Sequence, residues 1–134
     1  MKKEILGKYI LQTPLPEHAK QQAELQEIVF PTLSAEELIT EEKYKRHLEI
    51  FPEGQFIVLD GDRVIASCTT LRQNYHKGHH TFLEISDDLW LGTHDPKAEW
   101  IYGLDVSVHP DYQGKGIGRE IYNARQEVAK ALGC

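Results

Sequence analysis

Four short stretches of the chain have the apolar, β-branched pattern of β-strands. They are residues 8–12, 56–59, 64–71 and 101–108, and residues 79–85 are a further candidate. Asp60-Gly61 separates the second stretch from the third, and this dipeptide is typical of a two-residue hairpin turn. In the last of the four, apolar and polar residues alternate from Leu104 to Val108, and Pro110 marks its end. A sheet of at least four strands is therefore expected.

Three other stretches have the three-to-four-residue apolar spacing of amphipathic helices. The spacing predicts a helix over 17–30 and one or two helices between 34 and 51, where Ser34 opens a capping-box pattern. A further helix is predicted from Ile117 onward, and Gly133 is placed as its C-terminal cap. This last helix directly follows the last strand, so the strand, its exit loop and the helix form one local unit.

Length and composition limit the classes of function that are open to the chain. At 134 residues and 40% apolar content, the chain has the size of one globular domain. Its net charge of −6 argues against nucleic acid as a partner, because phosphate backbones are bound by clustered Lys and Arg. No stretch approaches the roughly 20 apolar residues of a membrane span, and the N-terminus lacks the apolar run of a signal peptide. Cys68 and Cys134 are too few and too distant for a disulfide scaffold, which fits a reducing cytoplasm.

A glycine-rich loop joins the last strand to the last helix. Its sequence, Gln113-Gly-Lys-Gly-Ile-Gly118, has three glycines in five positions. Glycine lets the backbone turn tightly and point successive N–H groups at one ligand, and the following helix N-terminus adds a partial positive charge. The loop is therefore expected to bind a phosphate or pyrophosphate group, with Lys115 and Arg119 adding charge. The alternative is a strand-to-helix turn that uses glycine for geometry alone.

Two common phosphate-binding motifs do not fit this loop. A Walker P-loop needs Gly-Lys followed by Ser or Thr, but Lys115 is followed by Gly116. A dinucleotide-binding fingerprint needs a third glycine three residues after the second. That position holds Arg119 or Ile121, depending on which glycine is taken first.

The loop resembles the acetyl-CoA motif of the GNAT superfamily of N-acetyltransferases, which reads Arg/Gln-x-x-Gly-x-Gly/Ala. Gln113, Gly116 and Gly118 occupy its fixed positions. The preceding Val-x-Val-x-Pro, from Val106 to Pro110, is similar to the family's fourth strand. The resemblance implies a GNAT-like acyl-CoA N-acyltransferase fold of the α/β (α+β) class, with a mixed central sheet flanked by helices.

The same resemblance implies how acetyl-CoA would bind as the cosubstrate. Backbone amides of the loop would hold the pyrophosphate, and the backbone of the preceding strand would pair with the pantetheine arm. The cofactor-binding residues expected on this basis are Val106, Ser107, Val108, Gln113, Gly114, Lys115, Gly116, Ile117, Gly118 and Arg119.

In this family an amine attacks the thioester directly, so the resemblance implies acetyl transfer to a primary amine of a small molecule or a protein. A lysine-like amine is almost entirely protonated at pH 7, so a base must take its proton. Tyr102 stands where several relatives carry a base glutamate, and Glu99 and Asp105 are the nearest carboxylates. Asp105 would have a raised pKa if it were buried without a partner; the alternative is a hydrogen-bonded structural residue. The family places the oxyanion donor at a backbone N–H near Val108.

The resemblance also concerns lineage and the end of the chain. Residues 47–55 and the strand after them are similar to a GNAT domain that precedes a carbon–nitrogen hydrolase domain in some bacterial proteins. In GNAT proteins a further strand follows the helix, and a tyrosine on a later helix is commonly the general acid. A single domain over 1–134 that is incomplete at its C-terminus is therefore expected. The strand at 101–108 is expected to be a parallel strand, and in this chain it would keep an open apolar edge, which favours a homodimer.

Other readings of the sequence remain open. His76, His79 and His80 form a His-x-x-His-His pattern, but only Glu84 is near enough in sequence to complete a zinc site, so no metal is expected. The departure from glutamate at Tyr102 and the missing region motivate a different class of function, a non-catalytic acyl-CoA-binding or regulatory domain. A purely structural interaction domain would bind no CoA at all.

Overall fold

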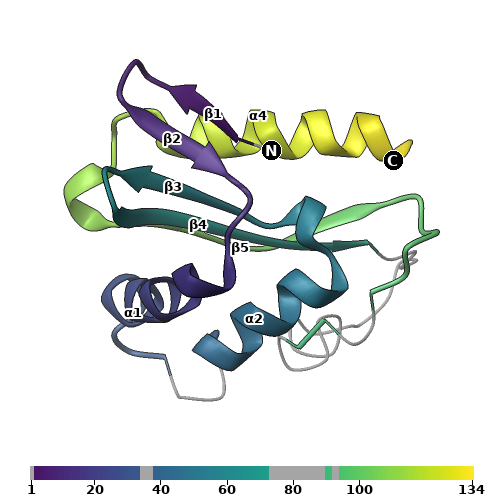
Figure 1. Ribbon diagram of the computed structural model, residues 1–134, viewed down its shortest axis with the longest axis horizontal. Helices are drawn as coiled ribbons and strands as arrows, with labels where there is room; N and C mark the ends of the chain where they lie inside the picture. Colours follow the sequence, from purple (N-terminus) through teal and green to yellow (C-terminus); the bar gives the residue numbers. More distant parts are fainter. Residues whose placement is uncertain (1, 34–37, 73–89, 92–93) are drawn as a thin grey trace.

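The computed structural model describes residues 2–33, 38–72, 90–91 and 94–134. The described strands form one sheet of five, in which each strand pairs antiparallel with the next along the chain (Figure 1). They are β1 (Lys2–Ile5), β2 (Tyr9–Gln12), β3 (Phe56–Asp60), β4 (Arg63–Arg72) and β5 (Ile101–Val108). The four predicted strands and the hairpin turn are confirmed, and Gly61 takes the positive φ of +62° that the turn requires.

Three helices follow the predicted pattern. They are α1 (Ala19–Val29), α2 (Glu41–Ile50) and α4 (Ile117–Leu132), with 3₁₀ turns at Pro16–His18, Pro52–Gly54 and Pro110–Tyr112. The N-cap of α2 is Thr40, whose Oγ1 accepts a hydrogen bond from the Lys43 N–H at 3.4 Å. The predicted cap, Ser34, lies outside the described residues. The predicted cap of α4 is confirmed, because Gly133 ends the helix in the left-handed conformation with φ +77°.

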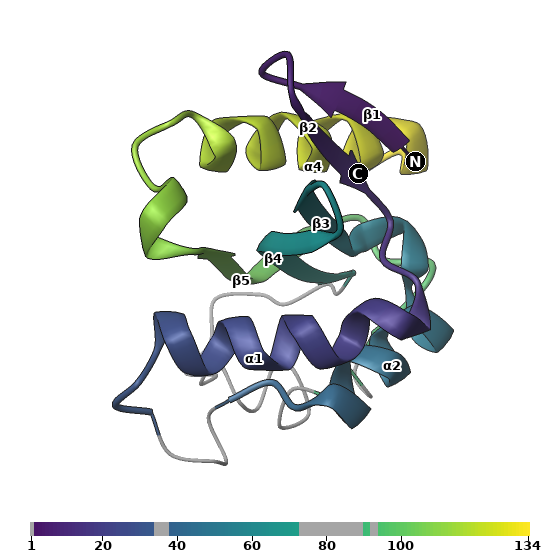
Figure 2. The same cartoon turned by 60° about the vertical axis from the view of Figure 1, so that its left-hand side comes forward.

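The helices lie on both sides of the sheet. Helix α4 covers one face, and α1 and α2 cover the other (Figures 1 and 2). Under α4, Ile117 and Ile121 pack with apolar side chains of β1 to β4 in the largest core cluster. On the other face, Leu25 of α1 packs with Ile57 and Val64. Strand β5 lies at the end of the sheet, so it has a helix on each face and β4 along one edge.

Two features of the sheet differ from the expectation. The apolar pattern does not predict β1, because Lys-Lys-Glu-Ile holds only one apolar side chain, Ile5, which is buried. The parallel arrangement expected for residues 101–108 is not found among the described strands, since β5 pairs antiparallel with β4. That expectation was based on the helix that directly follows the strand. A connecting helix makes the next strand parallel to the strand before the helix, but it does not determine how that first strand pairs with its other neighbour. The strand candidate at 79–85 lies outside the described residues.

Candidate functional site

Strand β5 contains an extra residue close to its candidate catalytic side chains. Gly103 and Asp105 stand opposite consecutive residues of β4, so Leu104 between them has no counterpart. Such a bulge shifts the alternation of side chains by one position. Tyr102 and Asp105, which an unbroken strand would place on opposite faces, therefore lie on the same face.

Asp105 is held by two side chains beneath α1. Its Oδ2 accepts hydrogen bonds from Gln26 Nε2 and from Ser107 Oγ, each at 2.9 Å. Burial raises the pKa of Asp105, and the hydrogen bonds from Ser107 and Gln26 act in the opposite direction because they favour the carboxylate. The two alternatives considered for Asp105, a raised pKa and a hydrogen-bonded position, are therefore present together.

Further polar side chains are buried on the same face. Gln22, one turn before Gln26 on α1, donates from Nε2 to Ser67 Oγ at 2.9 Å. The Tyr44 hydroxyl of α2 is buried near Ser67 and Gln26, but it has no partner with good hydrogen-bond geometry among the residues that the structure describes. Burial, and to a lesser extent the charge of Asp105, raises the pKa of Tyr44 well above its usual value, against a smaller lowering by Ser67 and Gln26. Sequence reasoning missed these residues, although two glutamines four positions apart on a buried helix face were an available signal.

The outer edge of β5 has no partner strand within the described part of the chain. At the end of the strand, the His109 N–H donates to Ile65 O in β4 at 2.8 Å. Backbone groups of successive residues in an antiparallel strand alternate between its two edges, so those of Val108 and Val106 point away from β4. One of these outward groups already has a partner in the chain: Val108 O accepts a hydrogen bond from Gln113 Nε2 at 3.1 Å.

The glycine loop turns the chain from this edge into α4. Gly114 and Gly116 have φ angles of +79° and +90°, a conformation that strains other residues. Gly116 is the N-cap, and its carbonyl accepts the first helical hydrogen bond, from the Glu120 N–H at 3.2 Å. The N–H groups from Ile117 to Arg119 therefore have no acceptor within the helix. A Cβ added at Gly114 or Gly118 would meet nothing within 4 Å, so the backbone here is open to a ligand.

The loop is anchored on both sides. Tyr112, which precedes it, donates its hydroxyl to Asp60 Oδ2 at 2.5 Å. Ile117, which follows it, is 1% exposed and belongs to the core under α4. Lys115 and Arg119 are exposed beside the free N–H groups. A fixed backbone with free amides, a helix N-terminus and two cations can bind a phosphate or pyrophosphate.

The other two candidate catalytic residues lie toward the start of β5. Tyr102 is opposite Leu71 of β4 and is partly buried. Glu99 precedes β5 and lines a cleft of about 270 Å³ that also includes Trp100 and Arg125 of α4. The structure therefore brings Tyr102 to the face of Asp105 and places Glu99 at a different surface.

Gly103 allows Arg125 to approach β5 closely. A Cβ added at Gly103 would collide with Arg125 Nη1. The Arg125 guanidinium also lies 5.4 Å from the centre of the Tyr122 ring. Arg125 is thus a second residue near β5 that sequence reasoning missed.

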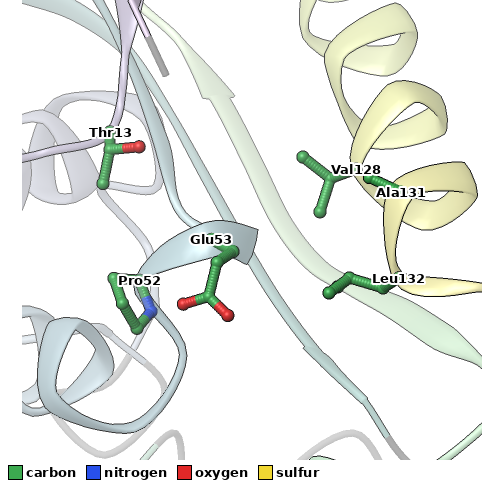
Figure 3. A pocket seen from close by; sticks show the side chains of 6 residues that line it. All are labelled: Thr13, Pro52, Glu53, Val128, Ala131 and Leu132. Carbon is green, nitrogen blue, oxygen red and sulfur yellow. The ribbon is translucent and has the colours of Figure 1, made fainter.

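A larger cleft of about 320 Å³ lies near the C-terminal end of α4 (Figure 3). It is lined by Thr13, Pro52, Glu53, Val128, Ala131 and Leu132. Val128 follows Gly116 by 12 residues, which at about 1.5 Å per residue corresponds to ~18 Å along the helix. This cleft is therefore separate from the glycine loop.

The histidine pattern at 76–80 and Glu84 lie outside the described residues. Among the residues that are described, no group of three or more His, Cys, Asp or Glu side chains could hold a metal ion. No helix in the described ranges is long and apolar enough to cross a membrane. Cys68 and Cys134 are free thiols, and burial raises the pKa of Cys68 to about 12.

A family comparison covers most of this architecture. The profile of the Acetyltransferase (GNAT) family matches residues 22–134. The matched region runs from α1 to the end of the chain and includes β5, the whole glycine loop and α4.

Two curated relatives come from Bacillus subtilis (strain 168). The chain is 40% identical over 88 residues to "Probable hydrolase YhcX" and 33% identical over 107 residues to "Uncharacterized N-acetyltransferase YkwB". The alignments cover 64% and 78% of this chain but only 17% and 47% of the relatives. The chain thus spans less than half the length of each, and the first relative agrees with the predicted similarity to hydrolase-linked GNAT domains.

Two solved structures share the fold. The loading GNATL domain of CurA from Lyngbya majuscula superposes with a TM-score of 0.74 at 19% identity, covering 89% of this chain and 57% of that one. The GphF GNAT-like decarboxylase in complex with isobutyryl-CoA gives a TM-score of 0.69 at 14% identity, covering 88% and 57%. At such identities the likeness concerns the fold alone, and it confirms the predicted GNAT-like α+β architecture.

Proposed function

Because the chain belongs to the GNAT acetyltransferase family, we propose that it transfers an acetyl group from acetyl-CoA to a primary amine of a small molecule or a protein. The observation that carries the proposal is the open edge of β5 leading directly into the glycine loop of α4. The Gln113 side chain joins the two, through its bond to Val108 O. A ligand with an extended amide-containing arm and a pyrophosphate fits this surface, and CoA has both parts.

Acetyl-CoA would be bound mainly by backbone groups. The pyrophosphate would accept hydrogen bonds from amides between Gly114 and Arg119, supported by the exposed Lys115. The pantetheine amides would pair with the outward backbone groups of β5 from Val106 to Val108. The open space beside Gly114 and Gly118 supports this placement, because side chains there would lie in the path of the phosphates. The isobutyryl-CoA complex of GphF supports an acyl-CoA as the class of ligand.

Asp105 is the group we assign as the base. The acceptor ammonium gives a proton to its carboxylate, and the nitrogen lone pair then attacks the thioester carbonyl carbon. The Val108 N–H would stabilise the resulting oxyanion. The intermediate expels CoA as its thiolate, the nitrogen loses its second proton, and the thiolate takes up one proton. The products are the amide, free CoA and one proton released to solvent.

A non-catalytic acyl-CoA-binding domain is the second candidate function. Tyr102 favours it, because the family resemblance implies a base glutamate at this position and this chain has a tyrosine there. Turnover distinguishes the two. We expect thiol release from acetyl-CoA, followed with a thiol-reactive dye, to depend on an added primary amine. Binding without release in the presence of small amines, lysine peptides and peptides with free N-termini would favour the second candidate, and no binding would contradict both.

The proposal also concerns compartment and assembly. Two free thiols fit a reducing compartment such as the cytoplasm. The open edge of β5 could pair with a second copy as a homodimer. Because such pairing would cover the backbone groups assigned to pantetheine, acetyl-CoA should shift an edge-paired dimer toward monomer in sedimentation experiments.

A further inference from the structure

Gln26 joins three parts of the fold through one side-chain amide. Its Nε2 donates to Asp105 Oδ2 and to Ser107 Oγ, each at 2.9 Å. Its Oε1 accepts a hydrogen bond from the Ile39 N–H, in the segment before α2, at 3.2 Å. Gln26 is only 2% exposed, so the side chain has no alternative partner in solvent.

The chemistry of the partners determines the orientation of this amide. The Ile39 backbone N–H can only donate, so the Gln26 oxygen must face it. Nε2 must then face Asp105 and Ser107, where it donates both of its protons. A flipped amide would place its oxygen against the Asp105 carboxylate and its NH₂ against the Ile39 N–H, leaving both contacts unsatisfied. Ser107 Oγ could bond the flipped oxygen only by turning its proton away from Asp105.

The result is a carboxylate whose two oxygens are unequal. Oδ2 of Asp105 receives both donors, from Gln26 and from Ser107. No donor in the described part of the chain reaches Oδ1. Hydrogen bonds from two fixed donors hold the group in one orientation and favour its charged form.

We propose that Gln26 is a positioning residue, which orients the Asp105 carboxylate so that Oδ1 takes the proton of the acceptor amine. The inference rests on the proposed function for the identity of the proton donor, but the positioning itself concerns only this chain. In the proton transfer, the N–H bond of the ammonium breaks and an O–H bond forms at Oδ1. Gln26 touches neither substrate and acts through Asp105.

The other titratable groups around Asp105 do not take the role of Gln26. From α2, Tyr44 remains neutral because burial raises its pKa, and Lys43 lies 5.7 Å over the Trp90 ring. His47, also from α2, contacts Tyr44 edge to face. Cys68 of β4 remains a neutral thiol, with a pKa of about 12. The charged residues of α1 are exposed on its outer side: Lys20, Glu24 and Glu27.

The test compares Gln26→Leu and Gln26→Glu with a matched control, Gln22→Leu. Gln22 lies one turn away on the same helix, is equally buried, and bonds Ser67 instead of Asp105. The readouts are the pH profile of kcat/KM for acetyl transfer and the titration of the Asp105 carboxyl carbon by NMR, assigned with Asp105→Asn. Thermal melting and acetyl-CoA affinity show that each variant is folded and binds.

In Gln26→Leu the Asp105 carboxylate loses one of two donors, so the acid limb of the profile should move up by about one pH unit. On the acid side of the limb this gives about a tenfold lower kcat/KM, which recovers as the pH rises above the limb, while the affinity for acetyl-CoA stays the same. Gln26→Glu keeps the acceptor for Ile39 but adds a like charge, so its limb should move further. Gln22→Leu should leave both the limb and the NMR titration in place.

Three results would overturn the inference. One is an unshifted Asp105 titration in folded Gln26→Leu and Gln26→Glu. Another is a loss of activity that is equal at every pH, as a purely structural role would produce. The third is an equal shift in Gln22→Leu. If the natural protein transfers acetyl to no amine while the NMR titration shifts as described, the proposed function and the base role of Asp105 fail, but the clamp on Asp105 stands.

Discussion

The two faces of the sheet are built from different chemistry. The face under α4 is packed by apolar side chains from β1 to β4 and from α4. The face under α1 and α2 also has apolar clusters, but between them it buries amides and hydroxyls around β4 and β5 and partly buries the Asp105 carboxylate. The first face provides a rigid support for the glycine loop, and the second holds a titratable group in one orientation.

Strand β5 shows the difference most clearly. Its polar residue Ser107 is fully buried, whereas Val106 is 42% exposed. The alternation of apolar and polar residues alone predicts that Val106 faces the core and that Ser107 faces solvent. The inversion indicates that the polar face is arranged for more than stability, because burying a carboxylate costs free energy unless it is hydrogen-bonded.

Replacing the carboxylate should have the largest effect. We expect Asp105→Asn to lower kcat by about 10²–10⁴-fold, the usual contribution of a general base. The same change should stabilise the fold at neutral pH. Burial raises the pKa of Asp105 above its unfolded value, so the folded state binds the proton more tightly and the ionised group destabilises it at higher pH.

The pH dependence of that gain provides the check. The advantage of Asp105→Asn should be complete above the folded pKa and should disappear as the pH falls below about 3.9, the unfolded value for Asp. Urea denaturation at several pH values measures it. An Asn variant that is less stable at neutral pH, or as active as the natural protein, would contradict the role given to this face.

On the opposite face, Ile121→Ala should cost about 2–5 kcal/mol of unfolding free energy, through lost burial and the cavity left behind. Ile121 is fully buried in the core under α4. Since no charge is involved, the loss should be the same at every pH where the protein is folded. Denaturation curves that depend on pH more than those of the natural protein would show that the two faces are not independent.

Filling the space at Gly103 tests the junction between the two faces. Gly103→Val would collide with the Arg125 guanidinium and displace it from β5. Overpacking of this kind costs about 1–3 kcal/mol. In an Arg125→Ala background the same valine should cost distinctly less, and a double-mutant cycle measures the difference. Equal costs in both backgrounds would mean that Arg125 does not occupy this space.

The smallest effect is expected at the surface of α4. Lys3 of β1 pairs with Glu127 at 3.2 Å, and both side chains are partly exposed. Such a pair contributes about 0.2–1 kcal/mol and weakens with added salt. Lys3→Ala and Glu127→Ala in a double-mutant cycle, measured at low and high salt, check the value. A coupling free energy between Lys3 and Glu127 as large as the unfolding free energy lost in Ile121→Ala would mean that apolar packing is not the main interaction that stabilises α4.

The two faces also differ in how well the sequence predicts them. The strands at 56–59 and 64–71, the helix from Ile117 and its cap at Gly133 follow from local patterns, and the structure confirms them. The glycine loop is likewise local, since its φ angles and free amides arise within a few residues. Local periodicity is enough when an element buries one continuous apolar stripe.

The polar face depends on contacts that local patterns do not contain. Gln26 and Asp105 are 79 residues apart, and only the packing of α1 on β5 brings them together. The bulge at Leu104 moves Tyr102 to the face of Asp105, and the isolated glycine at 103 was the only local signal for it. Local patterns do not predict strand β1 either, because β1 is formed through its pairing with β2 and has no apolar alternation of its own.

Calorimetric titration of acetyl-CoA tests the central claim most directly, with three proteins compared: the natural one, Gly116→Val and Gly61→Val. Both glycines have positive φ and no side chain within 3.4 Å of an added Cβ, but only Gly116 belongs to the loop. The account predicts micromolar binding by the natural protein and by Gly61→Val, and at least about tenfold weaker binding by folded Gly116→Val. No binding by the natural protein, or unchanged affinity in folded Gly116→Val, would contradict it.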